Sequence, residues 1–240
     1  MRYGVVSDLH ANLPALEAAL AALESERVDR VVCAGDVVGY GPHPNECVAR
    51  LEEEGIPSVA GNHDLIAIGR LGFERTDDLA RRTLEWTRVA LTEEARACLE
   101  GLPLRWSDEA LTIAHGSIDD PEVYIRTDEQ AAAQLAALDR DPGVLVLGHT
   151  HVPQKYRDDQ GRLLINPGSV GQARERRRLA RFAIFDTDAG AVTFRTARYD
   201  DARTRRALVD AGLPPSAHHR KRTLRDRAAG VKAALAGRRS

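Results

Sequence analysis

The stretch "VLVLGHTHVPQ" at residues 144–154 places two histidines directly after a run of four apolar residues. A short apolar run of this kind is typical of a buried strand in a layered α/β protein. His149 and His151 then follow the strand end two positions apart, where both imidazole rings can be aimed at one point. Two idle histidines in an exposed turn would fit the same stretch, so the choice between these interpretations depends on the rest of the chain.

Four other apolar segments also read as strands, and each ends in side chains that can bind a metal. Amphipathic, helix-like stretches separate several of these strands, an alternation that is typical of an α/β layered fold. Helices are predicted at 12–26, 43–55 and within 76–100, with Asn12 as the cap of the first. The strand segments are "RYGVVSD" at 2–8, "VDRVVCAGD" at 28–36, "IPSVAGNHD" at 56–64 and "ALTIAHGS" at 110–117.

After His151 the alternation of predicted strands and helices gives way to another pattern. Residues 152–169 and 181–200 each carry a Gly-bearing turn between two alternating segments, so both predict β-hairpins. The tail predicts two short basic helices, at 203–215 and 218–237. His218 and His219 fall outside every motif and are expected at the surface.

The five strand ends together offer nine polar side chains. Ligands of open α/β sheets gather beyond the carboxyl ends of the strands. Each residue alone has an ordinary structural explanation, as a loop cap, a turn residue or a core histidine. Five recurrences at the same kind of position favour a shared site instead. The candidates are Asp8, His10, Asp36, Asn62, His63, Asp64, His115, His149 and His151.

Neutral imidazoles combined with a few carboxylates suit manganese, iron, zinc or nickel, whereas a cage of oxygen atoms alone would suit magnesium or calcium. One carboxylate can bridge two ions held ~3.5–4 Å apart, as two-metal hydrolases require. Two carboxylates only partly offset two divalent cations. Such a pocket keeps a positive surplus, which attracts phosphate and lowers the pKa of a bridging water.

The set of motifs resembles the calcineurin-like metallophosphoesterases, over residues 3 to about 199. The segments "INPGSVGQAR" at 165–174 and "ARFAIFD" at 180–186 are similar to the small microbial phosphodiesterase branch of that superfamily. The resemblance implies an α/β fold of the metallo-dependent phosphatase type, a four-layer α-β-β-α sandwich with two mixed β-sheets. Residues 1–199 would form this domain, and 200–240 a basic helical extension packed on it or trailing from it. The matching motifs, in family order, are Asp8-Leu9-His10, Gly35-Asp36, Gly61-Asn62-His63-Asp64, His115-Gly116 and Gly148-His149-Thr150-His151.

The resemblance also implies roles for these residues around two divalent transition-metal ions, manganese first, with iron, nickel or zinc as alternatives. His63, with Asp64 beside it, would protonate the leaving oxygen or stabilise the phosphoryl charge, the role of a general acid. Thr150 would face away or support its turn. One ion would be held by Asp8, His10, Asp36 and His151, and the other by Asp36, Asn62, His115 and His149, which makes Asp36 the bridge.

Two departures from the family bear on the substrate. Protein phosphatases of this superfamily carry Asp-Arg-Gly where this chain has Gly39-Tyr40-Gly41, so protein phosphatase activity is not expected. In the microbial branch a proline commonly follows "VGQ", and here Ala173 stands there, with Arg174 keeping the basic residue after it. Tyr40, His43 and Arg174 are candidate substrate contacts; the alternatives are a helix cap for His43 and a solvated surface residue for Arg174.

The expected function is hydrolysis of a small phosphoester, a diester rather than a monoester, by direct attack of metal-bound hydroxide. One alternative is a non-catalytic binding scaffold, as in the retromer subunit of this superfamily, which has lost the active-site histidine that this chain keeps as His63. Another is a nuclease, because residues 201–240 carry eleven Lys and Arg against three Asp and Glu, a local charge of +8. A solvated or packed helix pair explains the same charge, so nucleic acid is not favoured as a partner. The branch resemblance also makes a homo-oligomer an expectation.

Composition limits the class of protein. The chain has 240 residues, of which 43% are hydrophobic, enough for a substantial core. No apolar run approaches the ~20 residues that span a bilayer, and Met1 leads into "RYGVVSD" without an apolar signal segment. The three cysteines are scattered, without CxxC spacing, which suits a reducing compartment. We therefore expect a cytoplasmic protein with no membrane partner.

Overall fold

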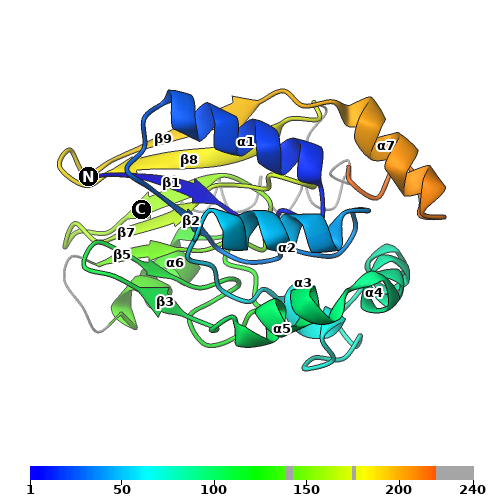
Figure 1. Ribbon diagram of the computed structural model, residues 1–240. Helices are drawn as coiled ribbons and strands as arrows, with labels where there is room; N and C mark the ends of the chain where they lie inside the picture. The colour runs from blue at the N-terminus through cyan, green and yellow to red at the C-terminus, as the bar shows by residue number, and fades with distance from the viewer. Residues whose placement is uncertain (139–142, 175–176, 220–240) are drawn as a thin grey trace.

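Two β-sheets pack face to face, with helices on their outer sides (Figure 1). The computed structural model describes residues 1–138, 143–174 and 177–219. One sheet has the strand order β2-β1-β8-β9 and the other the order β3-β4-β5-β7-β6. The strands are β1 Arg2–Val6, β2 Arg30–Cys33, β3 Trp106–Ser107, β4 Thr112–Ile113, β5 Val144–Val146, β6 Gln154–Arg157, β7 Leu163–Asn166, β8 Ala180–Asp186 and β9 Ala191–Ala197.

Both sheets are mixed. β1 pairs with β2 in parallel and with β8 antiparallel, while β5 lies parallel to both of its neighbours, β4 and β7. The helices of the described residues are α1 Leu13–Ser25, α2 Pro44–Glu53, α3 Asn62–Ala67, α4 Asp78–Ala90, α5 Glu93–Gly101, α6 Asp128–Ala136 and α7 Asp201–Asp210.

The layers follow from strands that are apolar on both faces. In β5, Val144 and Val146 belong to the core between the two sheets, whereas Leu145 between them packs on the outer side, with Leu135 of α6. The outer face of the other sheet packs against α1 and α2 in a third cluster. Because successive side chains of a strand point to opposite faces, a central strand between two layers must be apolar at every position. Three buried clusters thus join the four expected layers, and the predicted fold class is confirmed.

The predicted hairpins are confirmed as β6–β7 and β8–β9, which are both antiparallel pairs. The strand predicted at 56–64 is wrong. This segment touches the edge of β2 only through an isolated bridge between Cys33 and Ser58. Two residues after Ser58, the amide of Ala60 donates to the carbonyl of Pro103 at 2.8 Å. This hydrogen bond draws the chain away from the sheet. The polar residues expected at a strand end therefore stand at the start of α3.

The described part of the tail packs back onto the domain. Asn12 precedes α1 but makes no capping hydrogen bond. Its side chain instead donates to the carbonyl of Gly171 and accepts from the hydroxyl of Thr204 on α7, at 2.8 and 2.9 Å. The first predicted tail helix is confirmed as α7, whereas the second lies, beyond His219, outside the described residues. The boundary at residue 199 stays a prediction.

The surface position expected for His218 and His219 is wrong. Both are buried, with 1% and 8% of their surface exposed. After α7 the chain turns inward, where Gln172 Nε2 donates to the carbonyl of Ala217. His218 Nε2 then lies 2.5 Å from a carboxylate oxygen of Asp201. Neither contact has a local sequence signal, because the partners lie far apart in the chain. Among the described residues, no helix combines the length and the apolar character that a membrane span needs.

Candidate metal centre

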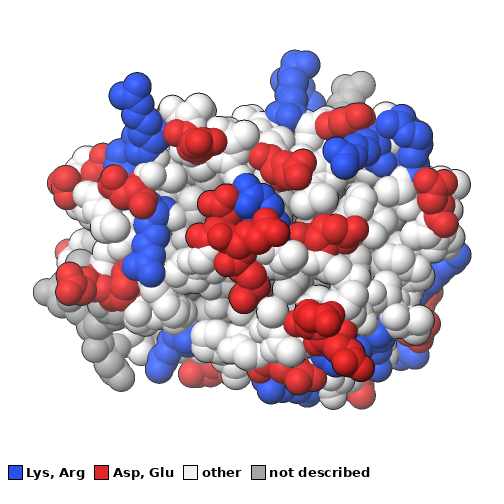
Figure 2. Space-filling view, viewed as in Figure 1, with Lys and Arg blue, Asp and Glu red and all other residues white. Residues whose placement is uncertain are grey.

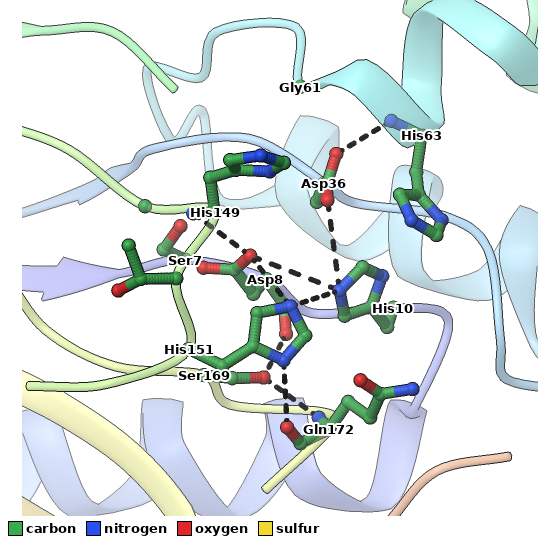
Figure 3. Close-up of polar contacts among 12 residues, drawn as sticks. Ser7, Asp8, His10, Asp36, Gly61, His63, His149, His151, Ser169 and Gln172 are labelled. Carbon is green, nitrogen blue, oxygen red and sulfur yellow. Dashed lines mark hydrogen bonds and ion pairs between the residues drawn. The ribbon is translucent and has the colours of Figure 1, made fainter. Parts of the chain in front are cut away.

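The predicted ligands follow strands of both sheets or stand at the start of α3, and Figure 3 shows Asp8, His10, Asp36, His149 and His151 lying together. Four strands deliver them, β1, β2, β4 and β5, and the start of α3 adds Asn62 and His63. Within each of three groups the potential ligand atoms lie within 4.8 Å of one another, and every member is buried. The groups are Asp8, His10 and His151; His10, Asp36 and His63; and Asp36, His115 and His149.

Backbone carbonyls orient four of the imidazole rings. In each ring one nitrogen lies within hydrogen-bond distance of a carbonyl oxygen, and in the tautomer that donates to this carbonyl the other nitrogen is the one available to a metal. Such a carbonyl contact fixes both the tautomer and the direction of a metal-binding histidine. The contacts are His10 Nδ1 to Val38 O at 3.2 Å, His115 Nδ1 to Ala34 O at 2.6 Å, His151 Nδ1 to Gln172 O at 2.9 Å, and His149 Nε2 to Glu122 O at 3.2 Å.

Several polar atoms at the centre are buried without a hydrogen-bond partner. They include Asp8 Oδ2, Asn62 Oδ1 and His115 Nε2. Buried polar atoms are normally paired, so unpaired ones that converge indicate a ligand. His10 Nε2 and His151 Nε2 lie only 3.0 Å apart, close enough for one cation to contact both. Imidazole nitrogens with carboxylate and amide oxygens suit divalent transition metals, so the residues fit such ions.

Charges in the centre are strongly coupled. Burial would raise the pKa of the Asp36 carboxyl, but the neighbouring His115 and His63 outweigh burial and hold this pKa well below its usual range. Burial likewise opposes protonation of His115, and Asp36 overcomes it, raising the pKa of His115 to about 9. For His149 burial prevails and lowers the pKa to about 3. A metal ion that binds beside Asp36 would displace the proton of His115, so metal binding should release protons.

The loops that carry the candidate ligands have an unusual backbone conformation. A φ angle in the left-handed region is uncommon for residues other than glycine, and such residues concentrate at functional sites. Hydrogen bonds between loops hold this backbone in place, for example from the amide of Asp8 to the carbonyl of Gly35 at 2.9 Å. Candidate ligands with φ between 47° and 64° are Asp8, His10, Asp36, His149 and His151.

The turn at 148–151 has a structural reason for each of its residues. A side chain at Gly148 would place its Cβ 2.0 Å from the hydroxyl of Ser7, so only glycine fits there. The amide of His149 donates to the Asp8 carboxylate at 3.1 Å (Figure 3). Thr150 supports the turn, as expected, because its hydroxyl donates to Val152 O and accepts from the side-chain amide of Asn166. His149 and His151 thereby enter different groups.

His63 lies beside the centre with a free ring nitrogen. Its amide donates to Asp36 at 2.8 Å, its Nδ1 is buried without a partner, and its ring lies 4.7 Å from that of Tyr40. The Asp64 carboxylate accepts from the amides of Gly61 and Val38, at 2.9 and 3.0 Å. Burial and the charge of Asp36 raise the pKa of Asp64 to about 7. Asp64 therefore fixes the start of α3.

Of the three candidate substrate contacts, two lie at the centre and one does not. The Tyr40 ring lies 4.7 Å from the ring of His10, within the centre. Arg174 Nε lies 3.2 Å from His151 Nδ1, so this arginine borders the centre. His43 stands before α2 without a side-chain capping bond, and burial lowers its pKa. The charged groups that act on it are Glu46, Arg203 and Glu17, from three surrounding helices, and not the candidate ligands.

A hollow between α1 and α2 lies away from the candidate ligands. Acidic and basic side chains are interspersed over this face, with the acidic ones gathered near its middle (Figure 2). Arg30, which lines the hollow, begins β2, whereas Asp36 follows the other end of that strand. Arg50, another lining residue, is paired with Glu54 at 2.6 Å. With its positive charge paired in this way, the hollow is no evident phosphate site.

Two residues that contact the ligands were missed from the sequence. Tyr124 stacks on His149 with ring centroids 3.9 Å apart, and Gln172 holds His151 through its carbonyl. Tyr124 stands in a loop without a motif, so no pattern in the sequence marks it. Gln172 belongs to the "VGQ" stretch, which did draw attention, but its contact is made by the backbone.

Comparisons with known proteins agree with this geometry. The family model for the calcineurin-like phosphoesterase superfamily domain matches residues 1–190. The crystal structure of a metallophosphoesterase from Sphaerobacter thermophilus is 40% identical with a TM-score of 0.79, covering 90% of this chain and 97% of that one. Protein MJ0912 of Methanocaldococcus jannaschii is 29% identical over 230 residues, 88% of this chain and 93% of its own. The fold is shared by protein PH1004 of Pyrococcus horikoshii OT3, with 23% identity, a TM-score of 0.79 and coverage of 90% and 95%.

Proposed function

The chain belongs to the calcineurin-like phosphoesterase superfamily, and from that premise we propose that it is a dinuclear metal-dependent phosphodiesterase acting on a small phosphoester. The observation that carries the proposal is the convergence of four backbone-anchored imidazoles on two buried carboxylates. Packing alone gives no reason to bury so many titratable groups in contact.

Asp36 is the residue that the two ions would share. Its carboxylate lies 3.7 Å from His10 Nε2 and 3.3 Å from His115 Nε2, so it reaches both sides of the centre. When bound, the ions would polarise the phosphoryl group and lower the pKa of a coordinated water. We expect manganese, and the same donors also suit iron, nickel or zinc. One ion would be held by Asp8, His10, Asp36 and His151, and the other by Asp36, Asn62, His115 and His149.

His63 is assigned the protonation of the leaving oxygen. The support is that its ring lies in one buried group with His10 and Asp36, that its backbone amide donates to the shared carboxylate of Asp36, and that its Nδ1 has no hydrogen-bond partner. Asp64 is assigned a positioning role, because its contacts with Gly61 and Val38 fix the turn that carries His63.

Arg174 is assigned a substrate contact. His151 Nδ1 lies near both the carbonyl of Gln172 and Arg174 Nε. A ring nitrogen that donates to the carbonyl cannot also accept from the arginine. In the tautomer that leaves His151 Nε2 free for a metal, the guanidinium therefore needs another acceptor, and a phosphoryl oxygen is one.

The preference for a diester rests on the turn at Gly39-Tyr40-Gly41. This turn brings a buried aromatic ring, and no cation, beside His63 and His10. A monoester carries a second phosphoryl charge, which would go without a partner there. An esterified oxygen with an organic group is tolerated better by an aromatic neighbour.

Turnover and metal content test the proposal together. Metal-stripped protein reloaded with Mn²⁺ should cleave bis(p-nitrophenyl) phosphate in preference to p-nitrophenyl phosphate. Asp36→Asn and His115→Ala should lose both turnover and bound metal, because each removes a ligand. Asp188→Asn, in the exposed turn after β8, is the matched control and should keep both. Full turnover in Asp36→Asn or His115→Ala would refute this centre.

The two alternatives make different predictions. A non-catalytic scaffold would show no turnover in the wild type with any of the four metals. A nuclease would bind DNA or RNA in a salt-sensitive way through the basic tail, whose residues after His219 lie outside the described ranges. Truncation after His219 keeps α7 in place, so loss of such binding on that truncation would favour the nuclease.

A further inference from the structure

Tyr124 lies at the rim of the metal centre, in the segment between β4 and α6. Its ring stacks on His149 at 3.9 Å with an interplanar angle of 30°. The guanidinium carbon of Arg126 lies over the same ring at 4.1 Å from its centroid. Two groups this close to one ring must occupy opposite faces. Both faces are therefore covered, although 40% of the Tyr124 surface remains exposed.

The hydroxyl of Tyr124 lies close to the candidate ligands, because the ring that carries it stacks directly on His149. No described residue hydrogen-bonds with this hydroxyl, so it is free to donate to a ligand.

The loop that carries Tyr124 is fixed before any ligand arrives. The carbonyl of Glu122 accepts from His149 Nε2, and Arg75 forms ion pairs with Asp120 and Glu122 at 3.3 and 3.5 Å. Ile125, the next residue after Tyr124, is buried against the outer face of the second sheet. A hydrogen-bond donor held in this way loses little conformational entropy on binding, so its hydrogen bond contributes more to the affinity than that of a flexible side chain.

We propose that Tyr124 is a substrate-binding residue whose hydroxyl donates a hydrogen bond to a phosphoryl oxygen of the phosphoester. The inference rests on the proposed function. Arg174 approaches the same oxygens from the His151 side, and Tyr124 from the His149 side. The pair supplies the donors to phosphate that the turn at residues 39–41 lacks.

The test is Tyr124→Phe, which keeps the ring between His149 and Arg126 but removes the hydroxyl. In Mn²⁺-loaded protein, calorimetry should show inorganic phosphate binding about 10-fold more weakly, up to about 100-fold, as expected for a lost hydrogen bond to a charged group. The value of kcat/KM for bis(p-nitrophenyl) phosphate should fall by a similar factor. Metal content and melting temperature should stay unchanged. Tyr156→Phe, a half-buried tyrosine on β6, is the matched control and should leave phosphate affinity unchanged.

Each outcome decides the inference. Equal phosphate affinity in Tyr124→Phe and wild type overturns it, and the proposed function still stands if the wild type turns over and Asp36→Asn does not. Loss of metal in Tyr124→Phe along with phosphate affinity also overturns it, because the effect then passes through His149. Weaker phosphate binding with intact metal supports it, even if the wild type proves inactive. A loaded wild type that turns over the diester but binds no inorganic phosphate overturns the inference alone, and a loaded wild type that does neither refutes both proposals.

Discussion

Replacing Gly39 with alanine should slow turnover without removing metal. Gly39 has φ of 88°, and a Cβ added there would lie 2.4 Å from His63 Nδ1. Ordinary contact begins at 3.4 Å, so the His63 ring must retreat by about 1 Å. A misplacement of that size at a reacting group costs about 10²-fold in rate. Complete loss of a general acid costs about 10²–10⁴-fold, so Gly39→Ala should lie near the low end of the effect of His63→Ala.

The backbone effect of this substitution needs its own control. A side chain in the left-handed region destabilises the fold by about 1–2 kcal/mol wherever it is placed. Gly69 has φ of 84° and no atom within 4 Å of an added Cβ, so Gly69→Ala carries the same strain without the contact. Gly39→Ala should lose at least as much stability as Gly69→Ala in urea unfolding, because the buried overlap adds to the strain, and only Gly39→Ala should lose rate.

The assays are kcat for bis(p-nitrophenyl) phosphate and metal content by mass spectrometry, on the same preparations. Wild-type kcat in Gly39→Ala would show that the position of His63 does not limit the reaction. A parallel loss of metal and rate would mean that the alanine disturbs the ligands, and the reasoning from the His63 contact would then be wrong.

Three more outcomes follow from contacts described above. Asn12→Ala should lower the free energy of unfolding by about 1–3 kcal/mol, because it leaves the carbonyl of Gly171 and the hydroxyl of Thr204 without their partner. In urea titrations, a loss no larger than that of the exposed Ser25→Ala would contradict this. Mn²⁺ at 100 times its Kd should raise that free energy by about 2.7 kcal/mol per site, checked by thermal melting with and without chelator; an unchanged melting temperature would argue against binding to the folded state. The free energy of unfolding of the metal-free protein should fall as the pH drops below about 6.5. Chemical unfolding at several pH values measures it, and a free energy that stays constant would refute the expected direction of the change. Among the described residues, burial holds the folded-state pKa of five histidines below the ordinary value, so the unfolded chain binds protons first. Asp64, raised to about 7, opposes this, and His115, raised to about 9, opposes it mainly above pH 6.5. The five are His10, His43, His63, His149 and His218.

The positions of the candidate ligands that follow β1, β2, β4 and β5 could be predicted from the sequence because each depends on a local pattern. A strand followed at once by Asp8 or His115 brings that side chain to the sheet edge whatever the rest of the chain does. The path of residues 56–64 could not be predicted, since it is decided by one hydrogen bond from Ala60 to Pro103, forty-odd residues away. The burial of His218 has the same kind of cause, a contact between the end of the chain and Gln172.

Tyr124 shows a further limit of sequence patterns. Its place against His149 depends on the whole course of the loop between β4 and α6, and a tyrosine in a loop has no spacing to mark it. Asp64 shows a related limit. Adjacent residues at a helix start point in different directions, so neighbours in sequence need not be neighbours in the site.

Main-chain carbonyls, rather than side chains, aim the four imidazoles, and this has an evolutionary consequence. Val38, Ala34, Glu122 and Gln172 can be exchanged for other residues without altering the acceptor, provided that the chain keeps its path. Their side chains take no part in aiming the rings, whereas the histidines that they orient cannot be replaced in that role. Grafting this centre into another scaffold would therefore require copying a backbone trace, and transplanting the ligands alone would leave their rings unaimed.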